Sequence, residues 1–336
     1  EVSGSTVTFS TDCSVLVIEG DGSIVTINSG VTIDRAANIV VDTQSSTNTT
    51  ITNNGTIEAT DSLYGIRNTT PGHIANLINN GTITADGSGV RNGGTITILT
   101  NAGTISAVNG ENGIVNKKTG TIETLTNSGT ISSSGRYALQ NVGIITTLEN
   151  SGTISASNYA INNKGGTIVT FTNTGTLTPT GGGREISNQG TITTFNNSQG
   201  KLCPDPCALG DNVVDWMKVL PTNYNVIVNP ENLIDSTSDY GQIDFDTFTG
   251  TTTFGVHSSS NLEGSTTYSS VLSGLSDSDI AAGTSDSFVK PGSSKRYDWT
   301  LENVSDTTLW NLVVAAEQDI TPDTNTSVTN SVKPNV

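Results

Sequence analysis

The sequence has few charged, aromatic and sulfur-containing residues. Of its 336 residues, 13% are charged and 5% are aromatic, and there is one methionine. No apolar run reaches about 18 residues, so no membrane-spanning helix is predicted. The only histidines are His73 and His257, which makes a serine-centred catalytic triad implausible. Neither a phosphate-binding P-loop nor a dinucleotide fingerprint is present.

Basic residues are also scarce, and the formal net charge is −17. Residues 1–200 contain 13 acids and 8 bases, whereas residues 201–336 contain 18 acids and 6 bases. A surface of this sign repels nucleic acid and anionic lipid, so neither is an expected partner.

Only three cysteines occur. Cys203 and Cys207 lie in the stretch "CPDPC", where two prolines stiffen a tight loop, and they are candidates for a local disulfide. A metal site would need more ligands than this stretch offers. Cys13 is left over, and is either buried or available for an intermolecular bond.

What the sequence does contain is a repeat. The motif N-x-G-T-I, with leucine in place of isoleucine in one copy, returns with a period of about 23 residues. The asparagines that open the copies are Asn53, Asn79, Asn101, Asn127, Asn150 and Asn173.

Each period carries further columns. A second glycine lies nine residues before the next copy of the motif, and a third apolar segment is followed by its own asparagine. The members of this second asparagine column are Asn68, Asn92, Asn116, Asn141, Asn163 and Asn188.

Three short strand-like segments per period predict one coil of a parallel β-solenoid. The apolar columns would stack into the core, with coils about 4.8 Å apart. We expect the two asparagine columns to form ladders of side-chain amides between coils. Glycine at the corners allows positive φ or a close backbone approach. The repeated motif is therefore interpreted as scaffold.

The phrases "NSGTIS", "NNGTIT" and "GIVN" resemble the passenger regions of bacterial autotransporter adhesins over roughly residues 20–200. This resemblance implies a right-handed parallel β-helix displayed on the cell surface. Residues 219–314, with "DYGQIDF" and "WTLENVSDTTLWNLVV", resemble the segment that follows such repeats. One departure from the family is that no C-terminal outer-membrane barrel follows Val336. The start without methionine or signal peptide fits a processed, exported form as well as a piece of a longer chain.

The predicted class is all-β, with a smaller β-rich C-terminal domain after the solenoid. The expected parts are a solenoid over 1–202, a Cys-Pro linker over 203–210, a capping or assembly domain over 211–316 and an extended tail over 317–336. Asp211 to Val219 is expected to form a short helix, and the runs after it antiparallel strands. Trp299 and Trp310 are expected in two core strands.

Candidate chemistry is sparse. Asp61, Asp86 and Glu111 fall in the connection between the repeated motif and the third apolar segment and could approach one another, as a polysaccharide-degrading β-helix would require. Scattered solvated acids are the plainer explanation. A second set of acids offers candidate Ca²⁺ ligands, although loop solubility explains it as well. Its members are Asp239, Asp244, Asp246, Asp277 and Asp279.

The hydroxyl side chains beside the core isoleucines suggest another alternative. Five coils carry T-x-[ST], and such a two-column array resembles ice-binding solenoids. Threonine also simply suits the outer face of strands. Glu58 interrupts the array. The five pairs are Thr82/Thr84, Thr104/Ser106, Thr130/Ser132, Thr153/Ser155 and Thr176/Thr178.

Taken together, these patterns favour a noncatalytic extracellular or cell-surface protein, structural or adhesive, without a cofactor. Its expected partners are glycans or proteins of the cell surface, or copies of itself. Head-to-tail polymerisation would follow if the tail or cap of one subunit paired with the N-terminal edge of the next. Polysaccharide binding or degradation and ice binding are the alternatives.

Overall fold

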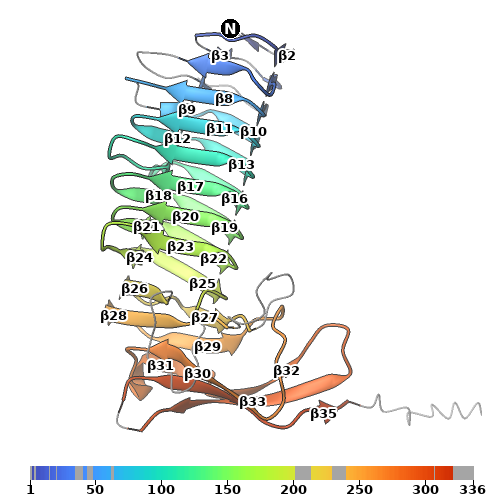
Figure 1. Cartoon of the computed structure of the whole chain (residues 1–336), viewed down its shortest axis with the longest axis vertical. Helices are drawn as coiled ribbons and strands as arrows, with labels where there is room; N and C mark the ends of the chain where they lie inside the picture. The colour runs from blue at the N-terminus through green and yellow to red at the C-terminus, as the bar shows by residue number, and fades with distance from the viewer. Residues whose placement is uncertain are drawn as a thin grey trace, which may run out of the picture.

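A rod of stacked coils dominates the molecule (Figure 1). The computed structural model describes residues 2–3, 5–14, 16–19, 21–34, 41–43, 48–61, 64–200, 213–228, 240–305 and 307–320. The fold is an all-β parallel solenoid of about nine turns, as the repeat predicts. Within the described residues the only helical segment is a 3₁₀ turn, Asp277–Asp279. Cys203, Cys207, Asp239 and residues 321–336 lie outside the described residues.

The middle sheet forms one side of the rod and has 12 strands, all parallel. From His73–Asn79 to Thr191–Asn197 adjacent strands stay in register, so that Asn79 pairs with Asn101, and Asn101 pairs with Asn127. The strands are β2 (Thr6–Phe9), β4 (Ile24–Ile27), β7 (Thr49–Asn53), β10 (His73–Asn79), β13 (Thr95–Asn101), β16 (Thr121–Asn127), β19 (Ile144–Asn150), β22 (Thr167–Asn173), β25 (Thr191–Asn197), β27 (Asn223–Val226), β29 (Thr252–Val256) and β31 (Ile280–Ala282).

The short sheet forms the second side, with seven parallel strands. Each strand follows the N-x-G corner of its coil, and the isoleucine of the motif points inward. The strands are β5 (Thr32–Asp34), β8 (Thr56–Ala59), β11 (Thr82–Ala85), β14 (Thr104–Ala107), β17 (Thr130–Ser133), β20 (Thr153–Ala156) and β23 (Thr176–Pro179).

The long sheet forms the third side and continues into the C-terminal cap, reaching 16 strands. Its parallel part contains β1 (Val2–Ser3), β3 (Leu16–Glu19), β6 (Val41–Asp42), β9 (Tyr64–Asn68), β12 (Ser88–Asn92), β15 (Ile114–Asn116), β18 (Tyr137–Asn141), β21 (Tyr159–Asn163), β24 (Arg184–Asn188), β26 (Val214–Val219), β28 (Ile243–Thr249) and β30 (Thr266–Ser273). Its antiparallel part contains β34 (Trp310–Val314), β33 (Lys295–Asn303), β32 (Ser285–Val289) and β35 (Gln318–Asp319).

The core is a set of apolar columns inside the three sheets. Ile83, Ile105 and Ile131 are fully buried and stack in register from coil to coil. Burying apolar side chains of this size contributes about 1.5–3 kcal/mol each. A strand buried on one face alternates inward and outward residues, which is why the isoleucines alternate with threonine and serine.

Two asparagine ladders run through the solenoid, in the columns that the repeat predicts. In the first ladder each Nδ2 donates to the Oδ1 of the next coil at 2.7–3.1 Å, and Asn197 adds a member beyond Asn173. In the second the distances are 2.8–2.9 Å. All of these amides are buried. Buried amides need partners, and the ladder supplies them along the rod axis.

The corner glycines are required by close packing. A Cβ on Gly129 would overlap the carbonyl oxygen of Gly103, and one on Gly103 would overlap that of Gly81. None of these three has positive φ. Of the two roles that the sequence leaves open for corner glycine, the structure shows close backbone approach here.

The predicted boundary near residue 202 does not end the parallel stacking. β26 pairs in parallel with β24, β27 with β25, and β28 and β29 continue both sheets. The helix expected over 211–219 is wrong, because Val214–Val219 forms β26. Val214 and Trp216 alternate with Asp215 and Met217, and this period of two suits a strand.

Among the described strands, antiparallel pairing occurs at the end of the rod, where β30, β34, β33 and β32 follow one another. A single antiparallel bridge joins Val228 to Tyr240 outside these strands. The expectation of antiparallel strands from Val219 onward is therefore wrong for β27, β28 and β29. Trp299 and Trp310 lie on β33 and β34 and are buried, as predicted. Residues 318–319 of the expected tail form β35 on the edge of this cap.

An aromatic column ties the cap to the repeats. Phe171 stacks on Phe195 with ring centroids 4.9 Å apart, and Phe195 contacts Tyr224 at 5.8 Å. Tyr224 contacts Phe254, whose ring lies 5.6 Å from that of Trp299. The leucine column of the earlier coils thus becomes aromatic toward the C-terminus, and it joins the two parts into one core.

Candidate functional site

The three corners of the solenoid differ in charge. The corner between the middle and short sheets contains N-x-G and related residues, and residues 54–55, 80–81, 102–103, 128–129, 151–152 and 174–175 include no charged side chain. We call it the neutral corner. Charged side chains gather at the other two corners, where the chain enters and leaves the long sheet.

The acidic corner joins the short sheet to the long sheet and contains Asp61, Asp86 and Glu111. The structure brings two of them together, since the main-chain N–H of Asp61 donates to Asp86 Oδ2 at 2.6 Å. Glu111 instead offers its main-chain carbonyl to Ser133 Oγ. The described residues contain no group of three or more His, Cys, Asp or Glu side chains arranged to hold a metal.

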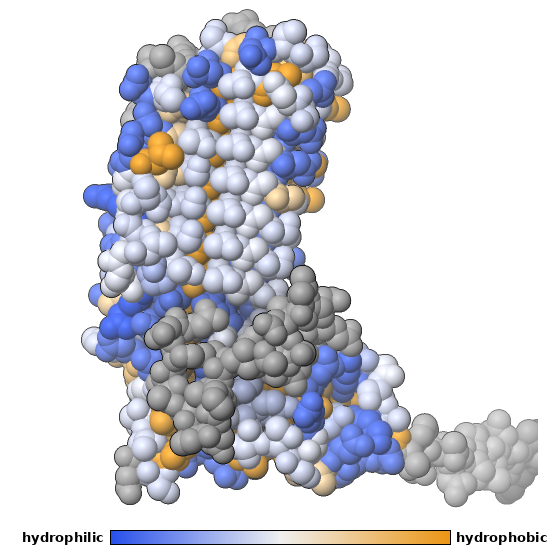
Figure 2. Space-filling model, in the orientation of Figure 1, coloured by the Kyte–Doolittle hydropathy of each residue, from blue (hydrophilic) through white to orange (hydrophobic). Residues whose placement is uncertain are grey.

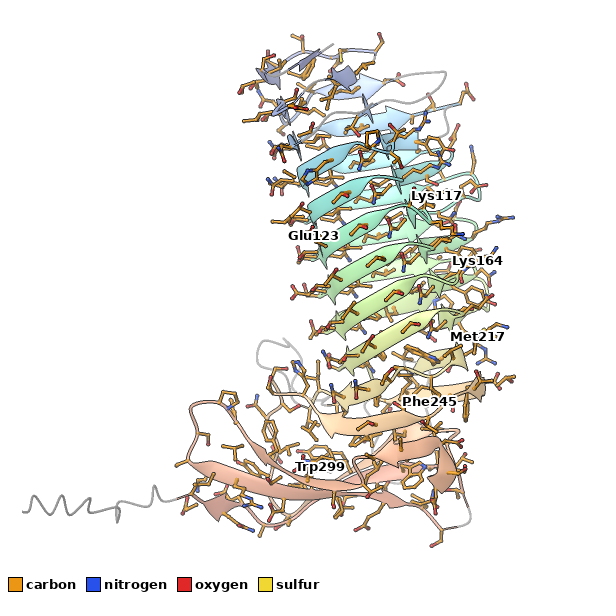
Figure 3. The ribbon with its side chains drawn as sticks, turned by 180° about the vertical axis from the view of Figure 1, so that it is seen from behind. Lys117, Glu123, Lys164, Met217, Phe245 and Trp299 are labelled. Atoms are coloured by element: carbon orange, nitrogen blue, oxygen red, sulfur yellow. The ribbon has the colours of Figure 1, made fainter. Side chains whose placement is uncertain are left out.

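The basic corner joins the long sheet to the middle sheet. Its residues 69–72, 93–94, 117–120, 142–143, 164–166 and 189–190 include Lys117, Lys118 and Lys164 and no acid. All three lysines are exposed. Lys117 and Lys164 project from the same edge of the rod in Figure 3, opposite Glu123. Arg67 and Arg91 lie on β9 and β12 beside this corner.

A pocket of about 260 Å³ opens at the basic corner. Arg91 is held by Tyr64, with its guanidinium carbon 4.7 Å from the ring centroid. Thr70 and Thr119 both donate to the carbonyl of Gly93. The pocket therefore combines cations with fixed hydroxyl groups. Its lining is Arg67, Asn68, Thr69, Thr70, Arg91, Gly93, Lys117 and Thr119.

The short sheet presents a two-column array of hydroxyl side chains. From β11 to β23 its strands pair without a register shift, so the five T-x-[ST] pairs stand in line. Thr84 Oγ1 and Ser106 Oγ are hydrogen-bonded at 3.0 Å. Evenly spaced, near-white side chains cover this side of the rod in Figure 2. Asp34 and Glu58 occupy the second column in the two coils that precede the five.

The candidate Ca²⁺ ligands do not converge. Asp244 and Asp246 lie on β28, and Asp246 forms an ion pair with Arg184. Asp277 and Asp279 lie in the 3₁₀ turn, where Asp279 Oδ2 accepts the main-chain N–H of Ser276 at 2.8 Å. The geometry therefore assigns Asp246 to an ion pair and Asp279 to turn capping.

A buried carboxyl group lies where the repeats meet the later coils. Glu185 is 7% exposed, and its Oε2 accepts the main-chain N–H of Asp215 at 2.8 Å. Burial raises the pKa of Glu185 to about 7, and the neighbouring Asp215 carboxylate acts in the same direction. Burial also raises the pKa of Asp215, against the opposing effect of Arg184 at 3.3 Å. This group gives the junction a pH-dependent charge.

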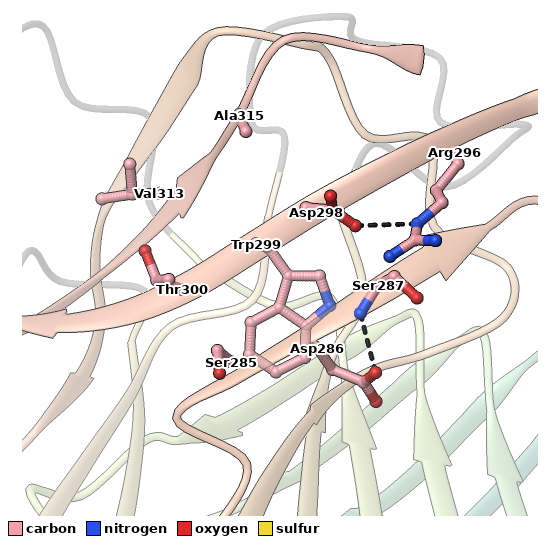
Figure 4. A pocket seen from close by; sticks show the side chains of 9 residues that line it. All are labelled: Ser285, Asp286, Ser287, Arg296, Asp298, Trp299, Thr300, Val313 and Ala315. Atoms are coloured by element: carbon pink, nitrogen blue, oxygen red, sulfur yellow. Dashed lines mark hydrogen bonds and ion pairs between the residues drawn. The ribbon is translucent and has the colours of Figure 1, made fainter. Parts of the chain in front are cut away.

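A second pocket, of about 430 Å³, lies on the antiparallel cap (Figure 4). Arg296 Nε donates to Asp298 Oδ1 at 2.8 Å on its rim, and Trp299 forms part of the wall. Trp299 is only 4% exposed and packs on Phe254, which makes it part of the core. Of the charged side chains in its lining, Arg296 and Asp298 pair with each other, and Asp286 accepts the main-chain N–H of Ser287 at 2.7 Å.

The basic corner is the feature that sequence reasoning missed. The signal was available, because Lys117 and Lys164 directly follow two members of the second asparagine column. The total charge of residues 1–200 does not reveal the basic corner, because this part of the chain contains more acids than bases. Cys13 is half-buried and its main chain bridges to Ile33.

The helices of the described residues include none long and apolar enough to cross a membrane. Comparison of the chain with protein-family models, with curated proteins and with solved structures gives no match. The repeat geometry and the distribution of charge are therefore the observations on which a function is proposed.

Proposed function

We propose that this chain is a noncatalytic structural or adhesive rod that works outside a bacterial cell. The observation that carries the proposal is the solenoid itself, with a fully buried core and two buried amide ladders along its axis. Such a rod is stiff and holds a surface away from its base. Outward side chains on the described repeats are mostly hydroxyls and amides, which suit contact with glycans or proteins.

The ends of the rod support head-to-tail assembly as part of this proposal. β2 pairs only with β4, and β32 pairs only with β33, so each has one unpaired edge among the described strands. Val7 and Phe9 of β2 are partly exposed, whereas Val25 and Ile27 one coil further are fully buried. Unpaired edges beside partly exposed apolar side chains favour addition of another strand.

Two measurements test the proposal. Antibody labelling of intact cells of the source organism should detect the protein at the surface, and labelling only after lysis would contradict the extracellular role. Electron microscopy and light scattering of the purified protein should show rods or fibres with a subunit-sized axial repeat. Monodisperse single rods at all concentrations would contradict the assembly step and leave the adhesive role.

Ice binding is a second candidate, favoured by the unbroken register of the hydroxyl array on the short sheet. Variation in coil length falls in the connections before and after the long sheet and leaves the array regular. Thermal hysteresis that is lost in Thr130→Tyr and kept in Thr124→Tyr, a change on the middle sheet, would establish this activity. No hysteresis in the unmodified protein would exclude it.

A further inference from the structure

The basic corner concentrates cations on a protein that is otherwise strongly acidic. Seven basic residues of the repeats are described, and every one lies on a strand of the long sheet or directly beside one. They are Arg67, Arg91, Lys117, Lys118, Arg136, Lys164 and Arg184. At a net charge of −17, chance placement would scatter these side chains among acids. Five of them line one corner over five successive coils, a length of about 20 Å at the usual strand spacing.

Four cations of this corner, Arg91, Lys117, Lys118 and Lys164, have no acidic partner within 4.0 Å among the described residues. The ion pairs in which both partners are described lie at Arg184 and in the C-terminal cap. Cations that fold without a partner remain available to a ligand.

One cation of this corner is held in place before any ligand binds. Arg91 lies on β12, and the ring of Tyr64 on the adjacent strand β9 packs against it. Stacking on Tyr64 fixes the guanidinium of Arg91, so less side-chain freedom is lost when a ligand binds.

We infer that the basic corner binds an acidic polysaccharide, with its carboxylate or sulfate groups on Arg91, Lys117 and Lys164. This inference rests on the adhesive role proposed above and names its ligand class. Arginine holds anionic oxygens through paired hydrogen bonds, and lysine acts as a point charge. Thr70 and Thr119, which line the same pocket, lie within reach of the hydroxyl groups of a sugar.

A polysaccharide fits this corner better than a nucleic acid does. Duplex DNA carries one negative charge per about 1.7 Å of axis and would be repelled by the acidic remainder of the molecule. An anionic glycan is a single chain, so it can place its charges along a single row of cations separated by one or two coils. Binding should therefore be weakened by salt, as for any exposed ion contact.

The test measures binding of the purified full chain to polygalacturonate, dextran sulfate, neutral dextran and a DNA duplex, at low and high salt. The double variant Lys117→Gln/Lys164→Gln is compared with Lys295→Gln/Arg296→Gln, which removes the same charge from the cap. Each lost ion contact in water weakens binding about fivefold, so the corner variant should bind about twentyfold more weakly. The cap variant should bind as the unmodified protein does, and circular dichroism checks that both fold.

Binding to polygalacturonate, to dextran sulfate or to both, with this loss in the corner variant, supports the inference and identifies the anionic group. No binding to either polymer, equal loss in both variants, or tighter binding to DNA overturns it. If the protein is displayed at the cell surface but binds neither polymer, only this inference is contradicted. If it binds them but is never found at the cell surface, the proposed function is contradicted instead.

Discussion

The side-chain amide of Gln199 accepts one hydrogen bond from the main chain of Leu177 and donates another to it. Leu177 N–H donates to Gln199 Oε1 at 2.7 Å, and Gln199 Nε2 donates to the Leu177 carbonyl at 2.9 Å. Leu177 lies on β23, which ends the short sheet among the described strands. One buried amide thus takes the place of the peptide group that the next strand would have supplied, and it protects the sheet edge.

Replacing Gln199 by alanine should destabilise this end of the repeats. The change leaves the buried N–H and carbonyl of Leu177 without partners, which costs about 1–3 kcal/mol. Urea unfolding followed by circular dichroism should show a lower midpoint for Gln199→Ala. Gln189→Ala, a change at an exposed position of a neighbouring coil, is the control and should leave the midpoint unchanged. Equal midpoints for both variants would contradict the capping role.

The central rungs of the asparagine ladders should be among the most sensitive positions of the rod. Asn127→Ala removes the hydrogen bonds to Asn101 and Asn150, so each of these buried amides loses one ladder partner, and Asn150 Oδ1 loses its donor. We expect a loss of about 2–4 kcal/mol in the free energy of unfolding. Asn80→Ala breaks a similar 2.8 Å bond to Asn54 in an exposed position and should cost less than about 1 kcal/mol. Similar losses in the two variants would show that burial of the ladder is unimportant.

The corner glycines make a steric prediction that separates two positions of similar appearance in the sequence. Gly129→Ala places a Cβ against the carbonyl of Gly103, whereas a Cβ on Gly93 meets no atom closer than 3.5 Å. Gly129→Ala should therefore lower the free energy of unfolding by more than about 2 kcal/mol. Gly93→Ala should change it by less than about 0.5 kcal/mol. Thermal melting of both variants checks the difference, and the reverse order would refute the packing explanation.

Because of Glu185, the free energy of unfolding should fall as the pH rises from about 5 to about 7. Its pKa is raised to about 7 by burial, so in that range the folded protein binds a proton that the unfolded chain has released. At low pH Glu185 is protonated and uncharged, so no charge is buried. Above pH 7 it is ionised, and the buried charge then lowers the free energy of unfolding by its full amount. Asp215 adds a contribution of the same sign, since its pKa is also raised.

The variant Glu185→Gln isolates this effect, because glutamine keeps an oxygen acceptor for the N–H of Asp215. Its melting temperature should match that of the unmodified protein at pH 5 and exceed it at pH 8. Asp286→Asn, a change at an exposed acid of the cap, should leave the difference in melting temperature between pH 5 and pH 8 unchanged. A Glu185→Gln protein with the original pH dependence would contradict the raised pKa.

The sequence was sufficient for the parts of the fold that repeat. Columns of asparagine, glycine and isoleucine specify the coil, because the residue in each column has the same structural role in every turn. The same reasoning failed at residues 211–219, where a helix was predicted although the apolar residues of β26 alternate as in a strand. The contact with β24 fixes the strand, because Trp216 pairs with Ile186 in the preceding coil. The chain therefore continues its parallel stacking past the point where the repeat motif stops.

What the sequence determined by itself was the class, the coil period and the buried ladders, because local pattern and strand register produce all three. Tertiary structure decided which charges become neighbours. Arg91 and Lys117 are far apart in the chain, and they line one pocket only because coils of unequal length are brought into register by the asparagines and glycines between them. Which charged side chains share a surface is therefore decided only when the coils stack.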